Sequence, residues 1–309
     1  MRRAGRECID HLLANEAAAR AGDLEGVHQM RVAVRRLRAI LSALAPLLPM
    51  ESRRCAANEL RWLADALGEA RNLDVLTSDI LEPARASLPP TNGLECLAEV
   101  IDRHSQYAHA EAEAAINSSR FSDSVRELMN WFDKSGWRGP ETDAPLCRPI
   151  GELAPMVLER RYRSVKKYSR QFGEQSEKQR HQLRIVLKKM RYAAELLSEL
   201  YNPAVSKRFL QRIKRLQDDL GYRNDVHVAR DTIDNLTNAK PRDPDLVKAG
   251  ERVVAWHQQR LADDEAKLRQ HLRQFLATEP FWSYRRNLRP TEPVHSGRHG
   301  RRPATEPHT

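Results

Sequence analysis

The sequence predicts an all-α protein built from two similar helical halves. Three observations support this fold class: apolar residues recur with helical period, Gly and Pro gather in short clusters, and one long segment occurs twice. The chain has 309 residues, 40% of them hydrophobic and 30% charged. This balance is typical of a globular protein with one large domain or two ordinary ones.

Clusters of Gly and Pro divide the chain into stretches long enough for substantial helices. We expect a first helical half at 1–135, a linker at 136–150 and a second half at 151–284. Residues 285–309 contain four prolines and six arginines with few apolar residues, which predicts a disordered basic tail. The predicted helices cover 3–21, 26–46, 51–81, 94–118, 121–134, 151–172, 176–201, 204–236 and 245–278.

The two halves repeat with a constant offset of 153 residues and no gap. The segment VHQMRVAVRRLRAILSAL at 27–44 aligns with RHQLRIVLKKMRYAAELL at 180–197, and LADALGEARNLDVL at 63–76 aligns with LQDDLGYRNDVHVA at 216–229. Twelve of 54 aligned positions are identical. Such a repeat predicts duplicated antiparallel bundles of about four helices each, joined by short loops. The most informative pairs are His28/His181, Gln29/Gln182, Arg31/Arg184, Arg38/Arg191, Asp65/Asp218 and Gly68/Gly221.

Each copy of the repeat predicts a helix with a basic face opposite an apolar face. Neither stretch contains an acidic residue between its His and its last Arg. Exposed helix faces usually mix signs, because like charges destabilise a helix. A plain solvated face is the alternative, but an acid-free stripe at matched positions in both copies favours a partner anion. The first stripe consists of His28, Arg31, Arg35 and Arg38, and the second of His181, Arg184, Lys188 and Arg191, with Tyr192 on the same side. Arg36 aligns with Lys189, which keeps the charge at that position in both copies.

The length of the stripes favours a long, linear anion. Each covers about 15 Å along its helix, whereas one small phosphate needs only a few donors at a point. Arginine offers a planar fork for bidentate phosphate contacts, and lysine offers a compact charge. Seven more basic residues join this set, although each alone is equally consistent with ordinary surface charge. They are Arg54, Arg61, Lys207, Lys214, Arg160, Arg163 and Lys167.

The histidines are not predicted to bind metal. His28 and His181 each have Arg at i+3 and lack a His, Cys or carboxylate at i+3 or i+4. Nearby cations disfavour a metal ion, whereas an anion would favour the imidazolium form. The sequence predicts no cofactor. The cysteines form no CxxC pair, which predicts reduced thiols at Cys8, Cys55, Cys96 and Cys147.

The charge of the chain points to a polyanion as its partner. Lys and Arg outnumber Asp and Glu by 52 to 42, and residues 151–236 carry 19 basic against 11 acidic side chains. The longest apolar stretch, near 39–50, is interrupted by Ser and Pro and is too short to span a bilayer. The first residues lack the apolar region of a secretion signal. We therefore expect a cytoplasmic protein that does not interact with membranes.

The repeated segments HQMRVAVRRLR and HQLRIVLKKMRY, with LGEARNLDVL and LGYRNDVHVA, resemble the CHAD family, the conserved-histidine α-helical domain. The resemblance covers residues 1–284. It implies two four-helix bundles related by pseudo-twofold symmetry, with a basic channel between them. Family members bind inorganic polyphosphate and can associate with polyphosphate granules. By resemblance, the channel would be lined by His28, Arg31, Arg35, Arg36, Arg38, His181, Arg184, Lys188, Lys189 and Arg191.

The sequence departs from the family pattern at Asn72, where members often have Asp; the second copy has Asp225. Some relatives carry a triphosphate-tunnel (CYTH) domain marked by an ExExK strand. That motif does not occur here, so we expect a free-standing binding module.

The sequence is consistent with three functions to different degrees. The leading hypothesis is non-enzymatic binding of inorganic polyphosphate. The alternative is a nucleic-acid (RNA)-binding protein that uses the same basic surface, although aromatic residues, on which bases stack, are only 6% of the chain. The third is hydrolysis or transfer of phosphate, which usually needs metal-holding carboxylates or a P-loop. The sequence shows neither pattern, so we expect a protein that is not an enzyme.

Overall fold

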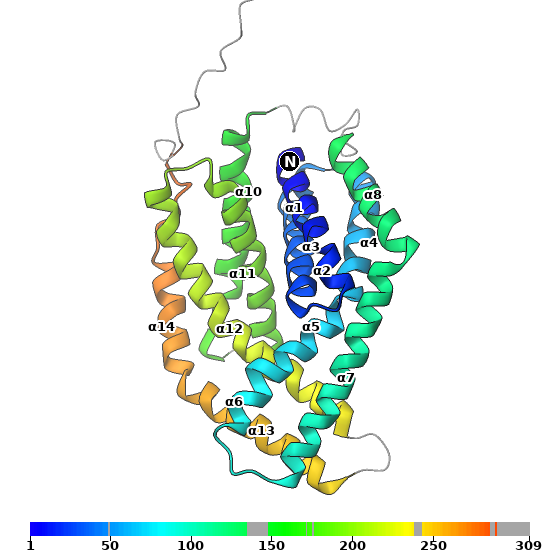
Figure 1. Ribbon diagram of the computed structural model, residues 1–309. Helices are drawn as coiled ribbons and strands as arrows, with labels where there is room; N and C mark the ends of the chain where they lie inside the picture. Colours follow the sequence, from blue (N-terminus) through cyan, green and yellow to red (C-terminus); the bar gives the residue numbers. More distant parts are fainter. Residues whose placement is uncertain are drawn as a thin grey trace, which may run out of the picture.

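The computed structural model describes residues 1–48, 50–134, 148–170, 172–174, 176–237, 243–284 and 288. Within these ranges all regular secondary structure is helical, apart from an isolated β-bridge between Tyr201 and Leu288. The predicted all-α fold class is confirmed (Figure 1).

The first half contains more breaks than its sequence predicts. The predicted helix at 3–21 is divided at Asn15, and the one at 51–81 is divided at Leu67 and then passes through a π-helix. The elements of this half are α1 (Arg2–Ala14), α2 (Glu16–Arg20), α3 (Leu24–Leu44), η1 (Ala45–Leu47), α4 (Met50–Ala66), α5 (Gly68–Val75), the π-helix η2 (Leu76–Leu81), α6 (Glu82–Arg85), α7 (Asn92–Asn117) and α8 (Ser119–Asp133).

The second half keeps its predicted long helix at 204–236 as one continuous element. The predicted helix at 245–278 is divided at Asp264. The elements of this half are α10 (Ile150–Tyr168), η3 (Phe172–Glu174), α11 (Glu177–Ser198), α12 (Pro203–Thr237), α13 (Pro244–Asp263) and α14 (Glu265–Leu276).

The two repeated helices begin at well-formed caps. The Asp23 side chain accepts a hydrogen bond from the Gly26 amide at 3.0 Å, just after Gly22 turns the chain with φ 78°. Ser176 and Gln179 form a capping box at the start of α11. These caps fix where the two basic stripes start.

Two helical bundles pack side by side. Helices α1, α3, α4 and α8 form the first bundle, and α10, α11, α12 and α14 form the second. Helix α3 packs against α11 where the bundles meet, and α7 packs against α13 beyond them (Figure 1). The bundles also interlock, because Val226, Ala229 and Ile233, in the second part of α12, belong to the core of the first half.

The remaining domain predictions fall mainly on residues outside those described. In the predicted linker, the described chain resumes at Arg148, and Ile150 begins α10. In the predicted tail, only Leu288 is described; it pairs with Tyr201 and packs partly against the second core. Cys8 is a buried free thiol and Cys55 and Cys96 are exposed ones, whereas Cys147 lies outside the described residues. Every described helix is too short or too polar to cross a bilayer.

Candidate functional site

A hollow opens where α3 and α11 meet. It consists of two adjoining cavities of about 590 and 370 Å³ that share seven lining residues, and we call the pair the central cavity. The apolar faces of both helices point away from it: Met30 and Leu37 are fully buried in the first core, and Leu183 and Met190 in the second. The shared residues are His28, Arg31, Arg35, Arg71, Arg184, Lys188 and Tyr192.

Positive charge dominates the walls of the central cavity. Eight cationic side chains face four aspartates, which leaves an excess of four positive charges. Both halves contribute, because the cations come from α3, α5 and α11. The cations are Arg31, Arg35, Arg38, Arg71, Arg184, Lys188, Lys189 and Arg191; the aspartates are Asp65, Asp79, Asp218 and Asp225.

Hydrogen bonds hold several of these cations in place. Arg31 donates to the Leu67 carbonyl at 2.9 Å, where the chain breaks between α4 and α5. Arg191 donates to the side chain of Gln217 at 3.1 Å. The Arg35 guanidinium lies 6.0 Å from the centre of the Tyr192 ring, within reach of a cation–π interaction. These contacts therefore position several of the cations in the cavity wall.

The pKa values in the cavity report an environment that disfavours charge. Burial, followed by the charges of Arg184 and Arg35, lowers the pKa of Lys188 to about 8. Burial is also the largest cause of the lowered pKa values of Arg31 and Arg184, and it raises the pKa of the Asp225 carboxyl. A bound anion would reverse these effects on the cations, because an opposite charge nearby favours the charged form.

The two repeated histidines occupy different environments. His28 lines the central cavity, and its Nδ1 atom is buried with no hydrogen-bond partner in the described structure. Burial, then the charge of Arg71, lowers its pKa. His181 is exposed, faces a separate hollow, and lies 3.3 Å from the Asn224 side chain through Nδ1. The expected equivalence of the two histidines does not extend to their surroundings.

Nine residues singled out from the sequence lie outside the central cavity, and His181, which faces the separate hollow, is one of them. Arg36 is exposed on the side of α3 that faces α1, and its charge acts on the Cys8 thiol. The other seven are exposed on α4, α10 and α12, because their helical spacing places them on the solvent side of those helices. They are Arg54, Arg61, Lys207, Lys214, Arg160, Arg163 and Lys167.

The structure adds cavity residues that the repeated stripes do not include. Arg71 and Asp79 come from α5 and η2, and Gln217 comes from α12. Arg71 lies in the second repeated motif, and that position was the signal that could have identified it, although its counterpart in the second copy is Asn224 and not a cation. Asp79 carries no such signal, since its direction depends on the π-helix.

Together these features define an all-helical protein with a basic cavity between two pseudo-symmetric bundles. The chain matches the CHAD domain family over residues 3–234 and belongs to that family. The crystal structure of the CHAD domain from the plant Ricinus communis superposes with a TM-score of 0.73 and 24% identity, covering 90% of this chain and 91% of that one. PptA from Streptomyces chartreusis superposes with a TM-score of 0.56 and 16% identity, covering 88% and 99%. These structural likenesses show a shared fold.

Two curated relatives come from Mycobacterium tuberculosis. The uncharacterized proteins Rv2226 (strain ATCC 25618 / H37Rv) and MT2285 (strain CDC 1551 / Oshkosh) are each 26% identical over 240 residues. The match covers 74% of this chain and 44% of each relative. The chain therefore spans less than half the length of the curated relatives that it matches.

Proposed function

We propose that this protein binds inorganic polyphosphate in the central cavity without transforming it. The observation that carries the proposal is the set of eight cations, drawn from both halves and facing only four aspartates. The lowered pKa values of Arg31, Arg184 and Lys188 identify three cations that a polyanion would stabilise. The family membership supports the same ligand.

The shape of the site favours a chain of phosphates over a single one. Arg31 and Arg38 are seven residues apart on α3, about 10 Å along the helix, and Arg184 and Arg191 repeat this spacing on α11. Arginine forks bind phosphate oxygens bidentately. A linear polyanion can contact the arginines of α3 and those of α11 at once. We also propose that the protein associates with polyphosphate granules.

Nucleic acid is the less favoured ligand. Single-strand binding usually combines a basic groove with several stacking aromatics. Tyr192 is the one aromatic residue that lines the described central cavity, and its ring already lies beside Arg35. The cavity therefore provides many cations to bind phosphates and few aromatic rings on which bases could stack.

A competition titration tests the proposal. Labelled long-chain polyphosphate is bound at near-physiological salt and challenged with tRNA, duplex DNA or orthophosphate at matched phosphate concentration. We expect unlabelled polyphosphate alone to displace the probe. Displacement by tRNA or DNA at the same concentration would instead indicate that the cavity binds nucleic acid.

A pair of double variants tests the location. Arg35→Gln with Lys188→Gln removes two charges from the central cavity, and we expect a loss of at least about 100-fold in affinity, as for two charge-assisted contacts. Arg54→Gln with Arg61→Gln removes two exposed charges outside it and should change affinity less than about threefold. Equal losses in the two variants would contradict the proposed site.

The absence of catalysis is tested separately, because Asp79 and Asp225 bring carboxylates to the cavity wall. Carboxylates that hold a divalent metal are a usual component of phosphate-transferring sites. We expect incubation of polyphosphate with the protein and Mg²⁺ to release no orthophosphate above background. Release that is lost in Asp225→Asn would show an enzyme instead.

A further inference from the structure

A second basic hollow lies at the start of α11, beyond the central cavity. Its volume is about 460 Å³, and we call it the side cavity. Helices α11, α12 and α13 and the start of α14 enclose it, and aromatic side chains are missing from its described lining. The polar residues that matter here are Arg180, His181, Arg184, Arg223, His227 and Glu265.

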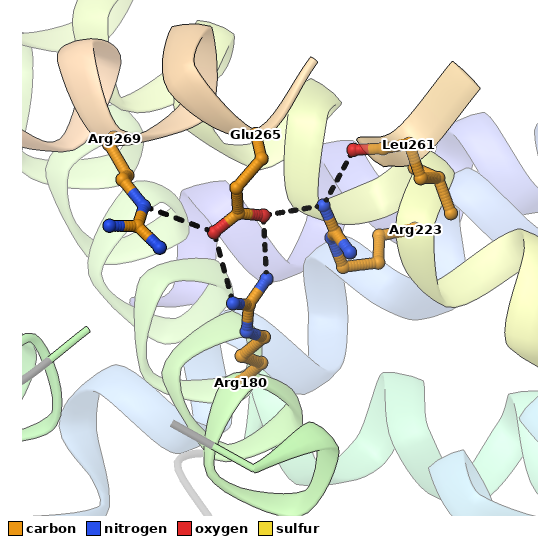
Figure 2. Close-up of polar contacts among 5 residues, drawn as sticks. All are labelled: Arg180, Arg223, Leu261, Glu265 and Arg269. Atoms are coloured by element: carbon orange, nitrogen blue, oxygen red, sulfur yellow. Dashed lines mark hydrogen bonds and ion pairs between the residues drawn. The ribbon is translucent and has the colours of Figure 1, made fainter. Parts of the chain in front are cut away.

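One carboxylate organises the arginines on this wall. Glu265 accepts two hydrogen bonds from Arg180, at 2.9 and 3.0 Å, and one from Arg223 at 2.8 Å (Figure 2). Arg269 donates a fourth hydrogen bond at 3.3 Å. Burial alone would raise the pKa of Glu265, but the hydrogen bonds and charge of Arg180 bring it below its ordinary value. Three guanidinium groups around one carboxylate leave two positive charges in excess.

The first half shows that the fold does not need these charges. With the 153-residue offset, Arg180, Arg223 and Glu265 correspond to Val27, Ala70 and Ala112. The three apolar residues are 2%, 1% and 0% exposed, and all three belong to the core of the first half. A bundle can therefore form with small apolar residues there. The ionic cluster of the second half calls for a role other than folding.

A second difference between the two halves concerns a pair of polar side chains near this position. Asp74 and His109 lie 2.8 Å apart in the first half, with side chains only 12% and 14% exposed. The same offset places His227 and Ala262 at those positions in the second half, and both line the side cavity. The hollow is thus open where its counterpart holds a mostly buried polar pair.

Arg184 connects the side cavity to the central cavity, because it lines both. Its Nε atom is buried with no hydrogen-bond partner in the described structure, and its Nη2 atom is 4.0 Å from the Asp225 carboxylate. Arg180, Arg184 and Arg191 follow one side of α11 over about 16 Å. A row of guanidinium groups therefore runs from one cavity to the other.

We infer that the side cavity is a second phosphate-binding subsite, which holds the segment of a polyphosphate chain that extends past Arg184. This inference rests on the proposed function of the central cavity. Glu265 keeps Arg180 and Arg223 extended and apart, and their excess charge attracts the phosphates. Short chains fill the central cavity alone, and longer chains gain affinity from the second subsite.

Two variants of opposite expected sign test the subsite. Arg180→Val, Arg223→Ala and Glu265→Ala together install the apolar residues of the first half. We expect unchanged affinity for tripolyphosphate and roughly tenfold weaker binding of long-chain polyphosphate, comparable to one lost charge-assisted contact. Glu265→Gln alone keeps the arginines and removes the negative charge, so binding of long chains should strengthen. Affinities are measured by isothermal titration calorimetry, and thermal melts report folding.

A charge-matched control separates local binding from general attraction. Arg3→Ala, Arg6→Ala and Glu7→Ala also remove two arginines and one glutamate, from the exposed part of α1, and should leave long-chain affinity within about twofold. Equal weakening by this control and by the triple variant would overturn the subsite, as would long-chain binding that neither cavity variant changes. If the wild type also binds orthophosphate, and the triple variant weakens that binding as much as it weakens long-chain binding, the cavity is a site for free phosphate. A wild type that binds no polyphosphate would remove the proposed function itself, and the inference with it.

Discussion

Lys188 lies among arginines in the central cavity with its pKa lowered to about 8, first by burial and then by Arg184 and Arg35. Polyphosphate would return this pKa toward 10.5, so binding should take up a proton near pH 8. We expect affinity to be full below about pH 8 and to fall as pH rises through that value, since the free lysine loses its charge. Calorimetry at about pH 8.5 in buffers of different ionisation enthalpy measures the proton uptake.

The stability of the free protein should respond to Lys188 with the opposite sign. Its folded pKa lies below the unfolded value, so the unfolded chain binds more protons between about pH 8 and 10.5, and this residue makes stability rise across that window. General alkaline unfolding would lower both affinity and stability as pH rises. Titration of Lys188 lowers affinity while its contribution to the free energy of unfolding rises. Lys188→Arg should flatten both profiles, and a flat affinity profile in the wild type would contradict the assignment.

At this scale the helical period identified much of the candidate site, because it fixes which residues share a face. Arg31, Arg35, Arg184 and Lys188 were all placed on stripes, and all line the central cavity. Arg36 was included because it aligns with Lys189 and because of the family resemblance. A helical step of about 100° separates it from Arg35, and it lies toward α1 instead of the cavity.

The π-helix η2 is an element whose position depends on a buried histidine. His257 of α13 is 1% exposed; its Nε2 atom donates to the Ile80 carbonyl at 2.8 Å, and its Nδ1 atom accepts from the Tyr222 hydroxyl at 2.6 Å. His257→Ala leaves both groups unsatisfied and should lower the free energy of unfolding by about 2–4 kcal/mol. Urea denaturation measures this loss.

An exposed histidine provides the control for this effect. His104 on α7 is exposed, and within the described residues its ring hydrogen-bonds to the Val100 carbonyl of its own helix, so His104→Ala should cost less than about 0.5 kcal/mol. Similar losses in the two variants would contradict a special role for His257. Because Asp79 lies within η2, we also expect His257→Ala to alter polyphosphate affinity at constant folded fraction.

Two helix glycines should respond to alanine with opposite signs. A Cβ atom at Gly93 would lie 2.5 Å from the Asp245 carbonyl oxygen, so Gly93→Ala must push α7 away from α13 and should cost about 1–3 kcal/mol. At Gly221 no atom lies within 4 Å of the added Cβ. Gly221→Ala should stabilise α12 by about 0.5–1 kcal/mol through helix propensity. Thermal melts compare the two, and destabilisation by Gly221→Ala would contradict this account.

Gly221 also illustrates what the sequence left undecided about the elements. A glycine within a predicted helix, such as Gly68 or Gly221, is consistent with a helix kink or with close packing. Gly68 does follow the break at Leu67, but Gly221 lies inside a continuous helix and faces the open central cavity. The repeat aligned the two glycines, but the structural role of each glycine differs because the two halves pack against different neighbours.

For the whole molecule, the duplication predicted two bundles but not how they interlock. Helix α12 contributes Phe209 and Ile213 to the second core and Ile233 to the first, so one helix spans both. Its apolar residues look the same in sequence whichever core they enter. The asymmetry at Glu265 was equally hidden, since it appears only when α14 is placed against α11 and α12.

The interlocked cores predict that the two halves unfold together. Ile233 is 1% exposed in the first core but belongs to the second half of the chain. Ile233→Ala should lower the free energy of unfolding by about 2–4 kcal/mol, because it creates a cavity in packed structure. Hydrogen exchange should then lose protection in α1 and in α10 by the same amount, since one cooperative unit opens as a whole. Polyphosphate, which would contact α3 and α11 at once, should restore protection in both bundles to the same extent. Loss confined to α1, or restoration of one bundle only, would instead describe two halves that fold and bind independently.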